Sequence, residues 1–198
     1  YSHFKTEAYQ KAIASFEDYR QRQTGKPANE RYTDALVRLA DCYFARSTYK
    51  KALKFYSKAI SREHKSVPYA LFQKGIIRGL QGEKDEKIRL LRQLTQNHQE
   101  SPYMDDALFE IGNVYFIRGD YRMAYNQFRY LTQDYQNSSF YRLAFLKMGL
   151  VRYNQNRTQP AIRQFKTVVQ KFPYSQEAKE AIDQLKHDRS EERFSRNA

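Results

Sequence analysis

Apolar residues recur every three or four positions along most of the chain, and this spacing predicts amphipathic α-helices. Short polar breaks interrupt the pattern, as in Gln-Gly-Glu at 81–83 and Arg-Gly-Asp at 118–120. Glycine can adopt the left-handed conformation that ends a helix, so each break marks a turn between two helices. One segment shows both apolar runs around its break: Leu108, Ile111, Gly112, Tyr115 and Phe116, then Ala124, Phe128 and Leu131. The pattern therefore predicts an all-α chain built from helix pairs.

The helix pairs recur at a step of 37 residues. Glycine, alanine and large apolar positions coincide at this step: Gly75, Gly112 and Gly149; Ala70, Ala107, Ala144 and Ala181; Leu91, Phe128 and Phe165. An earlier copy lies 35 residues upstream of the second, and a partial copy precedes it at Ala12, Phe16 and Tyr19. Recurring small residues indicate where two helices approach closely, because a larger side chain would separate their axes. Periods of 20 to 50 residues are typical of solenoids.

The copies divide the chain into six segments. We expect an N-terminal helix with a linker, four repeats and a capping helix with a tail, at residues 1–31, 32–66, 67–103, 104–140, 141–174 and 175–198. The last helix would cover the open apolar end of the fourth repeat.

The repeated positions resemble the signature of the tetratricopeptide repeat family, a bulky residue followed by Leu-Gly-x-x-Tyr, Ala-x-x-x-Phe and a closing Pro. The third copy matches best, at Leu108, Ile111, Gly112, Tyr115, Ala124 and Phe128. The resemblance covers roughly residues 32 to 185 and implies a right-handed superhelical solenoid of antiparallel helix pairs. The second copy departs most, with Arg78 in place of Tyr and Lys87 in place of Ala. Because that lysine must reach solvent along its alkyl stem, we expect a looser helix pair there.

The 37-residue step and the phrase Phe-Pro-Tyr-Ser-Gln-Glu-Ala at 172–178 resemble the bacterial envelope variety of the family. That variety includes outer-membrane barrel-assembly lipoproteins, the Tol-Pal coordinator and multi-repeat proteins of the Bacteroidetes. The resemblance favours a periplasmic or outer-membrane-associated location, with the cytoplasm as the alternative. The chain begins at Tyr1 without Met, so we expect a processed protein or a piece of a longer one. No stretch approaches about 18 uncharged apolar residues, so no transmembrane segment is predicted.

Charge favours an acidic partner. The chain has 35 Lys and Arg against 22 Asp and Glu, a formal net charge of +13. Residues 135–176 contain no acidic side chain, and a second basic cluster runs from Lys50 to Lys65. The alternative is a surface that binds nucleic acid or anionic lipid, whose affinity would fall steeply with salt. Against it, many of these cations lie on second helices, which the resemblance places on the outer side of a solenoid.

No residue pattern indicates catalysis. The four histidines are far apart, and no glycine-rich phosphate loop, nucleophile elbow or His-Glu-x-x-His motif is present. We therefore expect no enzymatic activity, no metal and no cofactor. Cys42 lies among apolar neighbours, where a buried, unreactive thiol is expected.

The resemblance also implies where a partner binds, because the first helix of each tetratricopeptide repeat lines a concave groove. Carried over position by position, the groove residues are Arg38, Asp41, Phe44, Phe72, Gln73, Ile76, Phe109, Asn113, Phe116, Lys147, Leu150 and Tyr153. Aromatic and arginine side chains in such a surface are typical of protein-binding hot spots. The alternative for Phe72, Phe109 and Phe116 is packing against neighbouring helices. Asp41 and Ile76 stand where the carboxylate clamp of chaperone-binding members needs Lys or Asn, so that clamp is not predicted.

These observations together predict a non-catalytic scaffold whose groove binds a protein or peptide segment. The oligomeric state stays open, because a second copy could cover an open end of the repeat stack.

Overall fold

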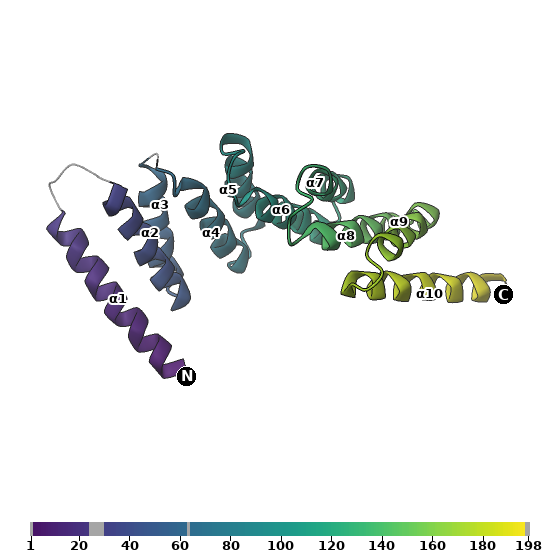
Figure 1. Cartoon of the computed structure of the whole chain (residues 1–198), viewed down its shortest axis with the longest axis horizontal. Helices are drawn as coiled ribbons and strands as arrows, with labels where there is room; N and C mark the ends of the chain where they lie inside the picture. The colour runs from purple at the N-terminus through teal and green to yellow at the C-terminus, as the bar shows by residue number, and fades with distance from the viewer. Residues whose placement is uncertain (1, 24–29, 63, 197–198) are drawn as a thin grey trace. The chain divides into compact units, whose positions relative to one another are not determined.

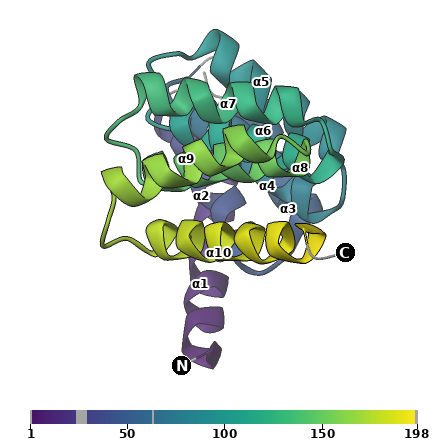
Figure 2. The same ribbon diagram turned by 90° about the vertical axis from the view of Figure 1, so that its right-hand side faces the viewer.

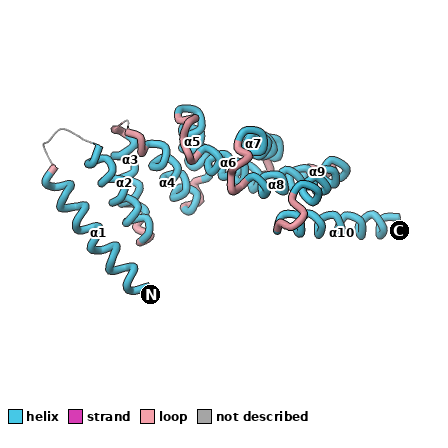
Figure 3. Tube along the Cα trace, in the orientation of Figure 1, coloured by secondary structure: helices cyan, strands magenta, loops and turns pink. Residues whose placement is uncertain are grey.

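The structure is a computed structural model that describes residues 2–23, 30–62 and 64–196. These residues form ten α-helices and no strand (Figures 1 and 3), which confirms the predicted all-α class. The chain divides into two units, unit 1 at residues 1–104 and unit 2 at residues 105–198. Across the described ranges, no helix has both the length and the apolar character that a membrane crossing requires.

Unit 1 contains five helices, each packed against the next one along the chain (Figure 1). They are α1 (Ser2–Arg22), α2 (Glu30–Ala45), α3 (Tyr49–Ile60), α4 (Val67–Leu80) and α5 (Lys84–Asn97). An apolar core joins α2, α3 and α4, with Leu36 and Tyr56 among its fully buried side chains. Ile13 and Phe16 of α1 pack against this core, so the N-terminal helix belongs to the same stack.

Unit 2 contains the remaining helices, and the first of them begins at the last residue of unit 1. They are α6 (Met104–Arg118), α7 (Tyr121–Asp134), α8 (Tyr141–Asn154), α9 (Thr158–Lys171) and α10 (Gln176–Arg196). Helix α8 packs against α7, α9 and α10, and α10 also packs along α9 (Figure 2). Ala178 and Ala181 of α10 are buried, so the apolar side of this helix covers the α8–α9 pair as expected.

One left-handed residue separates the two helices of each pair, at Ser47, Gly82, Gly119 and Asn156. Their φ angles are +54°, +81°, +80° and +56° respectively. Glycine adopts this conformation without a Cβ penalty and asparagine tolerates it, which explains three of the four choices. The turns predicted at Gly82 and Gly119 are confirmed, and Ser47 fills the same position in the first pair.

The recurring glycines lie where two helices nearly touch. A Cβ atom placed on Gly112 would lie 2.6 Å from the Phe128 ring, and one on Gly149 would lie 2.4 Å from the Phe165 ring. Carbon atoms do not approach this closely, so only glycine lets each ring pack this near to the facing helix. The predicted close approach is thereby confirmed in unit 2.

The second helix pair closes by a different arrangement. The alkyl stem of Lys87 lies on Gly79, where a Cβ atom would meet the lysine Cδ at 2.8 Å. At the repeat position of Gly79 the other copies carry Phe44, Phe116 and Tyr153. The missing aromatic ring thus makes room for the lysine stem, which compensates for the looseness expected from Lys87.

Cys42 is buried, as predicted. Burial raises the pKa of its thiol above the ordinary value, and the neighbouring Asp41 raises it further. Because the thiolate is the reactive form, this environment keeps the cysteine unreactive at neutral pH.

Candidate partner-binding surfaces

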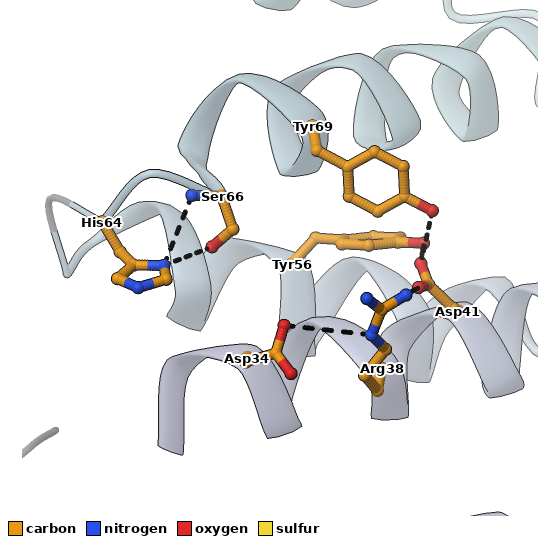
Figure 4. A network of polar contacts seen from close by, with 7 residues as sticks. All are labelled: Asp34, Arg38, Asp41, Tyr56, His64, Ser66 and Tyr69. Carbon is orange, nitrogen blue, oxygen red and sulfur yellow. Dashed lines mark hydrogen bonds and ion pairs between the residues drawn. The ribbon is translucent and has the colours of Figure 1, made fainter. Parts of the chain in front are cut away.

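A carboxylate that accepts two tyrosine hydroxyls lies on the predicted groove face of unit 1 (Figure 4). Asp41 of α2 accepts hydrogen bonds at Oδ1 from the Tyr56 hydroxyl of α3 at 2.6 Å and from the Tyr69 hydroxyl of α4 at 2.9 Å. The side chain of Gln73 lies near the Tyr69 hydroxyl and lowers the pKa of that group. One carboxylate therefore ties three successive helices together.

The pKa shifts of this cluster favour the protonated form of both tyrosine hydroxyls, which the two hydrogen bonds to Asp41 require. Burial raises the pKa of Asp41 above the ordinary carboxyl value, and the two tyrosine hydrogen bonds and Arg38 oppose this only in part. Burial, followed by the nearby carboxylate, also raises the pKa of Tyr56 and of Tyr69. Both hydroxyls therefore stay protonated and keep donating to the same oxygen.

The sequence singled out Asp41 but not the role of its tyrosine partners. Tyr56 occupies the repeat position of Leu91, Phe128 and Phe165. All four side chains are buried, and Tyr56 alone among them carries a hydroxyl. A buried tyrosine hydroxyl needs a hydrogen-bond partner, and this requirement was the available signal. No comparable signal marked Tyr69, because its contact with Asp41 spans 28 residues.

Aromatic contacts continue from this cluster through unit 1. The rings of Tyr56 and Tyr69 meet edge to face with centroids 6.4 Å apart, and Tyr69 lies 5.4 Å from Tyr103. Phe72 stacks on Tyr103 with centroids 5.9 Å apart. The predicted groove residue Phe72 is therefore half-buried against another ring, which is the packing alternative.

The other predicted residues of unit 1 differ in accessibility. Arg38 is exposed, and its guanidinium lies 3.9 Å from Asp41 and 3.8 Å from Asp34, both longer than a hydrogen bond. Phe44 is half-buried beside Tyr49, with ring centroids 6.0 Å apart. The remaining two, Gln73 and Ile76, are half-buried.

Phe109 in unit 2 does not line a groove. It is 5% exposed, stacks on Phe140 with centroids 4.4 Å apart and lies 5.8 Å from Phe128. The same repeat position holds Val37 and Leu146, which are also buried, and Phe72, which is half-buried against Tyr103. This position faces the interior of the helix pairs, so Phe109 belongs to the core and its assignment to the groove is wrong.

The remaining predicted groove residues of unit 2 lie on α6 and α8, and we call this set the α6–α8 face. It consists of Asn113 and Phe116 on α6 and Lys147, Leu150 and Tyr153 on α8, all half-buried. The Lys147 ammonium lies over the Phe116 ring, 5.3 Å from its centroid. This cation–π contact links the first helices of two successive pairs.

No group of three or more metal-ligating side chains occurs within the described ranges. The two surfaces instead combine aromatic rings with a few charged or amide groups. Surfaces of this composition are suited to binding peptide segments.

The paired helices, the left-handed turns at one repeat position and the rings packed on glycine define a helical-repeat protein. The chain belongs to the tetratricopeptide repeat family. Two sequence profiles described as "Tetratricopeptide repeat" match it, one at residues 1–68 and the other at residues 69–101 and 143–175. Its fold is typical of protein–protein interaction scaffolds.

Solved structures with the same fold confirm the repeat architecture. MamA superposes with a TM-score of 0.67 at 16% identity, over 82% of this chain and 88% of MamA. YrrB is a tetratricopeptide repeat protein described as having an unusual peptide-binding site. It superposes with a TM-score of 0.67 at 15% identity, over 89% of this chain and 84% of YrrB. A tetratricopeptide repeat protein from Parabacteroides merdae superposes with a TM-score of 0.65 at 17% identity, over 93% of this chain and 74% of that protein. No curated protein matches the chain in sequence.

Proposed function

We propose that this protein is a non-catalytic interaction scaffold that binds a protein or peptide segment on the α6–α8 face of unit 2. The observation that carries the proposal is the pairing of Lys147 with Phe116, which presents a cation and an aromatic ring on one half-buried surface. Aromatic side chains that keep part of their surface accessible provide large contact areas at a small entropic cost. The peptide-binding site described for YrrB shows that a structure of this fold can serve such a function.

The charge of this face favours an acidic segment. Within the described ranges, no carboxylate lies within ion-pair distance of Lys147. The sequence from 135 to 176, which includes all of α8 and α9, contains no Asp or Glu. An acidic residue of the partner would therefore meet an ammonium that forms no ion pair with a carboxylate of the described residues.

The groove face of unit 1 contributes less to this function. Asp41 already accepts two tyrosine hydroxyls, and Phe72 is stacked on Tyr103. Arg38 is the exposed charged group of this face, so it is the residue there that can contact a partner.

The resemblance to envelope repeat proteins supports a cellular role in envelope assembly. The same resemblance favours a periplasmic or outer-membrane-associated location. Cell fractionation with an antibody against the native protein tests the location, and recovery in the cytoplasmic fraction contradicts it.

Site-specific photo-crosslinking tests the binding face. The photoreactive amino acid p-benzoylphenylalanine replaces Phe116 or Tyr153 on the α6–α8 face and, as matched controls, Ile117 or Tyr130. These controls are 67% and 41% exposed in the same unit. We expect one protein to crosslink from 116 and 153 and not from the control positions.

Affinity capture of that protein gives the second readout. Phe116→Ala and Lys147→Gln each lower its recovery by about tenfold, as expected for hot-spot residues, whereas Tyr130→Ala leaves it unchanged. Equal crosslinking from all four positions, or unchanged recovery with Phe116→Ala and Lys147→Gln, contradicts the proposal.

A further inference from the structure

A second surface of unit 2 contains a cavity at the turn between α9 and α10. The cavity has a volume of about 510 Å³ and is lined by Arg142, Lys171, Phe172, Tyr174 and Glu177, among others. None of these residues belongs to the α6–α8 face. The volume is sufficient for a small polar group together with part of a neighbouring side chain.

Three aromatic rings hold the Lys171 ammonium at the edge of this cavity. The ammonium donates a hydrogen bond to the Tyr141 hydroxyl at 2.6 Å. It lies 4.9 Å from the ring centroid of Tyr141, 4.7 Å from that of Phe145 and 5.8 Å from that of Phe172. The rings meet one another edge to face with centroids 5.2 to 5.8 Å apart. The lysine is thus fixed in one place before any ligand arrives.

This fixed ammonium retains hydrogen-bonding capacity. An ammonium group has three N–H donors, and the Tyr141 hydroxyl accepts one of them. Within the described ranges no carboxylate forms an ion pair with Lys171. Because the side chain is already positioned by the rings, ligand binding costs little of its conformational entropy.

Arg142 supplies the second cation of the cavity. Its guanidinium Nε lies 3.8 Å from Glu177 Oε2, which is longer than a hydrogen bond. A guanidinium has five N–H donors in a planar fork that fits a carboxylate. Arg142 therefore has donors to offer to a ligand in addition to its weak contact with Glu177.

The charge in the cavity distinguishes between possible anions. Two cations and one carboxylate leave a single net positive charge, which matches one carboxylate of a ligand. A phosphate dianion would bring two negative charges next to Glu177 and is disfavoured by repulsion. The Tyr174 ring, 97% exposed beside the cations, provides an apolar contact for the residue next to the bound carboxylate.

We propose that this cavity binds the side-chain carboxylate of a Glu or Asp in a partner protein, with an adjacent apolar residue against Tyr174. Lys171 and Arg142 donate hydrogen bonds to the carboxylate. The inference rests on the proposed function in that the ligand is a protein segment, but it concerns a different surface.

Titration of the isotope-labelled 198-residue chain with short peptides, followed by amide NMR, tests this site. The probe is acetyl-Phe-Glu-Phe-amide, and its uncharged counterpart is acetyl-Phe-Gln-Phe-amide. We expect the charged peptide to shift the amide signals of residues 172–178 and the counterpart to bind at least about tenfold more weakly, because it lacks the charge-assisted hydrogen bonds.

Matched variants localise the effect. Lys171→Gln and Arg142→Gln each weaken binding of the Glu peptide about tenfold, and Tyr174→Ala weakens it a few-fold. Lys166→Gln changes the net charge equally on the exposed side of α9 and leaves binding unchanged. Circular dichroism confirms that each variant retains its helices, as expected for exposed positions.

The inference is overturned by equal binding of the Glu and Gln peptides, by unchanged binding in both Lys171→Gln and Arg142→Gln, or by tighter binding of inorganic phosphate at the same amides. Tighter binding of acetyl-Phe-Gln-Phe with a free terminal carboxylate also overturns it, because the ligand is then a chain end. The Lys147→Gln variant separates this test from the proposed function, since it alters the α6–α8 face and leaves the shifts at 172–178 intact.

Discussion

On the groove face of unit 1, the carboxylate of Asp41 is bound by hydroxyls of its own chain. Asp41 accepts two hydroxyls at 2.6 and 2.9 Å from helices α3 and α4. In unit 2, by contrast, the ammonium groups of Lys147 and Lys171 lie against aromatic rings. Neither lysine forms an ion pair with any carboxylate of the described residues.

The difference indicates how one repeat pattern serves two purposes. A carboxylate whose hydrogen bonds are completed within the chain stabilises the helix stack but has little left for a ligand. A cation over a ring is held in position while most of its N–H donors remain available. We therefore assign structural support to the Asp41 cluster, and we attribute the proposed partner binding to the lysines of unit 2.

The sharpest test of this comparison is Asp41→Ala, for which we expect the largest effect on stability. The substitution leaves the fully buried Tyr56 hydroxyl without an acceptor and removes one from Tyr69. An unsatisfied buried polar group costs about 1–3 kcal/mol, and Tyr69 is partly accessible to water, so we expect a loss of about 2–3 kcal/mol. Urea denaturation at pH 7 measures it.

Asp41→Asn is the matched control for this change. Its amide oxygen can accept both hydroxyls, so we expect a much smaller loss than for alanine. Equal losses for Asn and Ala would mean that the negative charge, rather than the acceptor, stabilises the cluster. No loss with alanine would contradict the structural role of Asp41.

A second test compares how tightly the two units are packed. A Cβ atom on Gly149 would lie 2.4 Å from Phe165 in unit 2, whereas one on Gly75 would lie 3.0 Å from Leu91 in unit 1. Overpacking costs about 1–3 kcal/mol, and replacing a helical glycine by alanine returns up to about 1 kcal/mol. We expect Gly149→Ala to destabilise by about 1–2 kcal/mol and Gly75→Ala to be nearly neutral.

Thermal and urea denaturation of both variants check this expectation. The double variant Gly149→Ala/Phe165→Leu reproduces the glycine-facing leucine of unit 1 and relieves the clash with the ring. We expect it to be more stable than the sum of the two single changes predicts. Strict additivity would show that the alanine and the ring do not interfere.

The repeat positions explain why most of the fold could be predicted. A left-handed turn and a close helix approach impose the same demand in each copy, so Gly82 and Gly119, or Gly112 and Gly149, recur at one step. The packing of Lys87 on Gly79 was harder to predict. Each residue departs from the repeat pattern, and only their contact in the structure shows that the small residue makes room for the long one.

The binding surfaces were less predictable, because helical spacing gives the face of a residue but not its accessibility. Phe109 has groove spacing, yet the rings of Phe128 and Phe140 cover it. The Lys171 contact with Tyr141 joins residues 30 positions apart, at the junction of a helix pair with the last helix. The preceding copy carries Met104 and Asp134 at these two positions, so comparison of the copies does not reveal the contact.

The third test uses the pKa of Asp41. Its folded-state pKa is raised, whereas in the unfolded chain it is about 3.9. The folded protein therefore holds this proton more tightly, and the associated stability is present below about pH 4 and is lost as pH rises through the folded pKa. We expect the free energy of unfolding of the wild type to fall relative to Asp41→Asn over that range.

Denaturation of the wild type and Asp41→Asn at several pH values from about 4 to 7 measures this difference. Because the two proteins differ only at residue 41, the titration of all other groups cancels when their stabilities are compared. A wild type that gains stability relative to the variant as pH rises contradicts the expected direction. It would mean that the tyrosine hydrogen bonds and Arg38 outweigh burial.

The smallest effect on stability is expected for Lys171→Gln in unit 2. The lysine is exposed, and a cation–π contact at an exposed site contributes about 0.5–1 kcal/mol, so urea denaturation should show a loss in that range. Lys166→Gln, which removes the same charge without a ring contact, should lie within about 0.5 kcal/mol of the wild type.

Measured beside Asp41→Ala, this variant completes the comparison of the two units. We expect Asp41→Ala to lower stability strongly and leave the binding of acetyl-Phe-Glu-Phe-amide unchanged under conditions where the chain is folded. Lys171→Gln should weaken binding of this peptide and change stability only slightly. A loss of stability for Lys171→Gln as large as that for Asp41→Ala would show that the aromatic contacts of Lys171 support the fold. The division between a structural cluster in unit 1 and binding cations in unit 2 would then have to be abandoned.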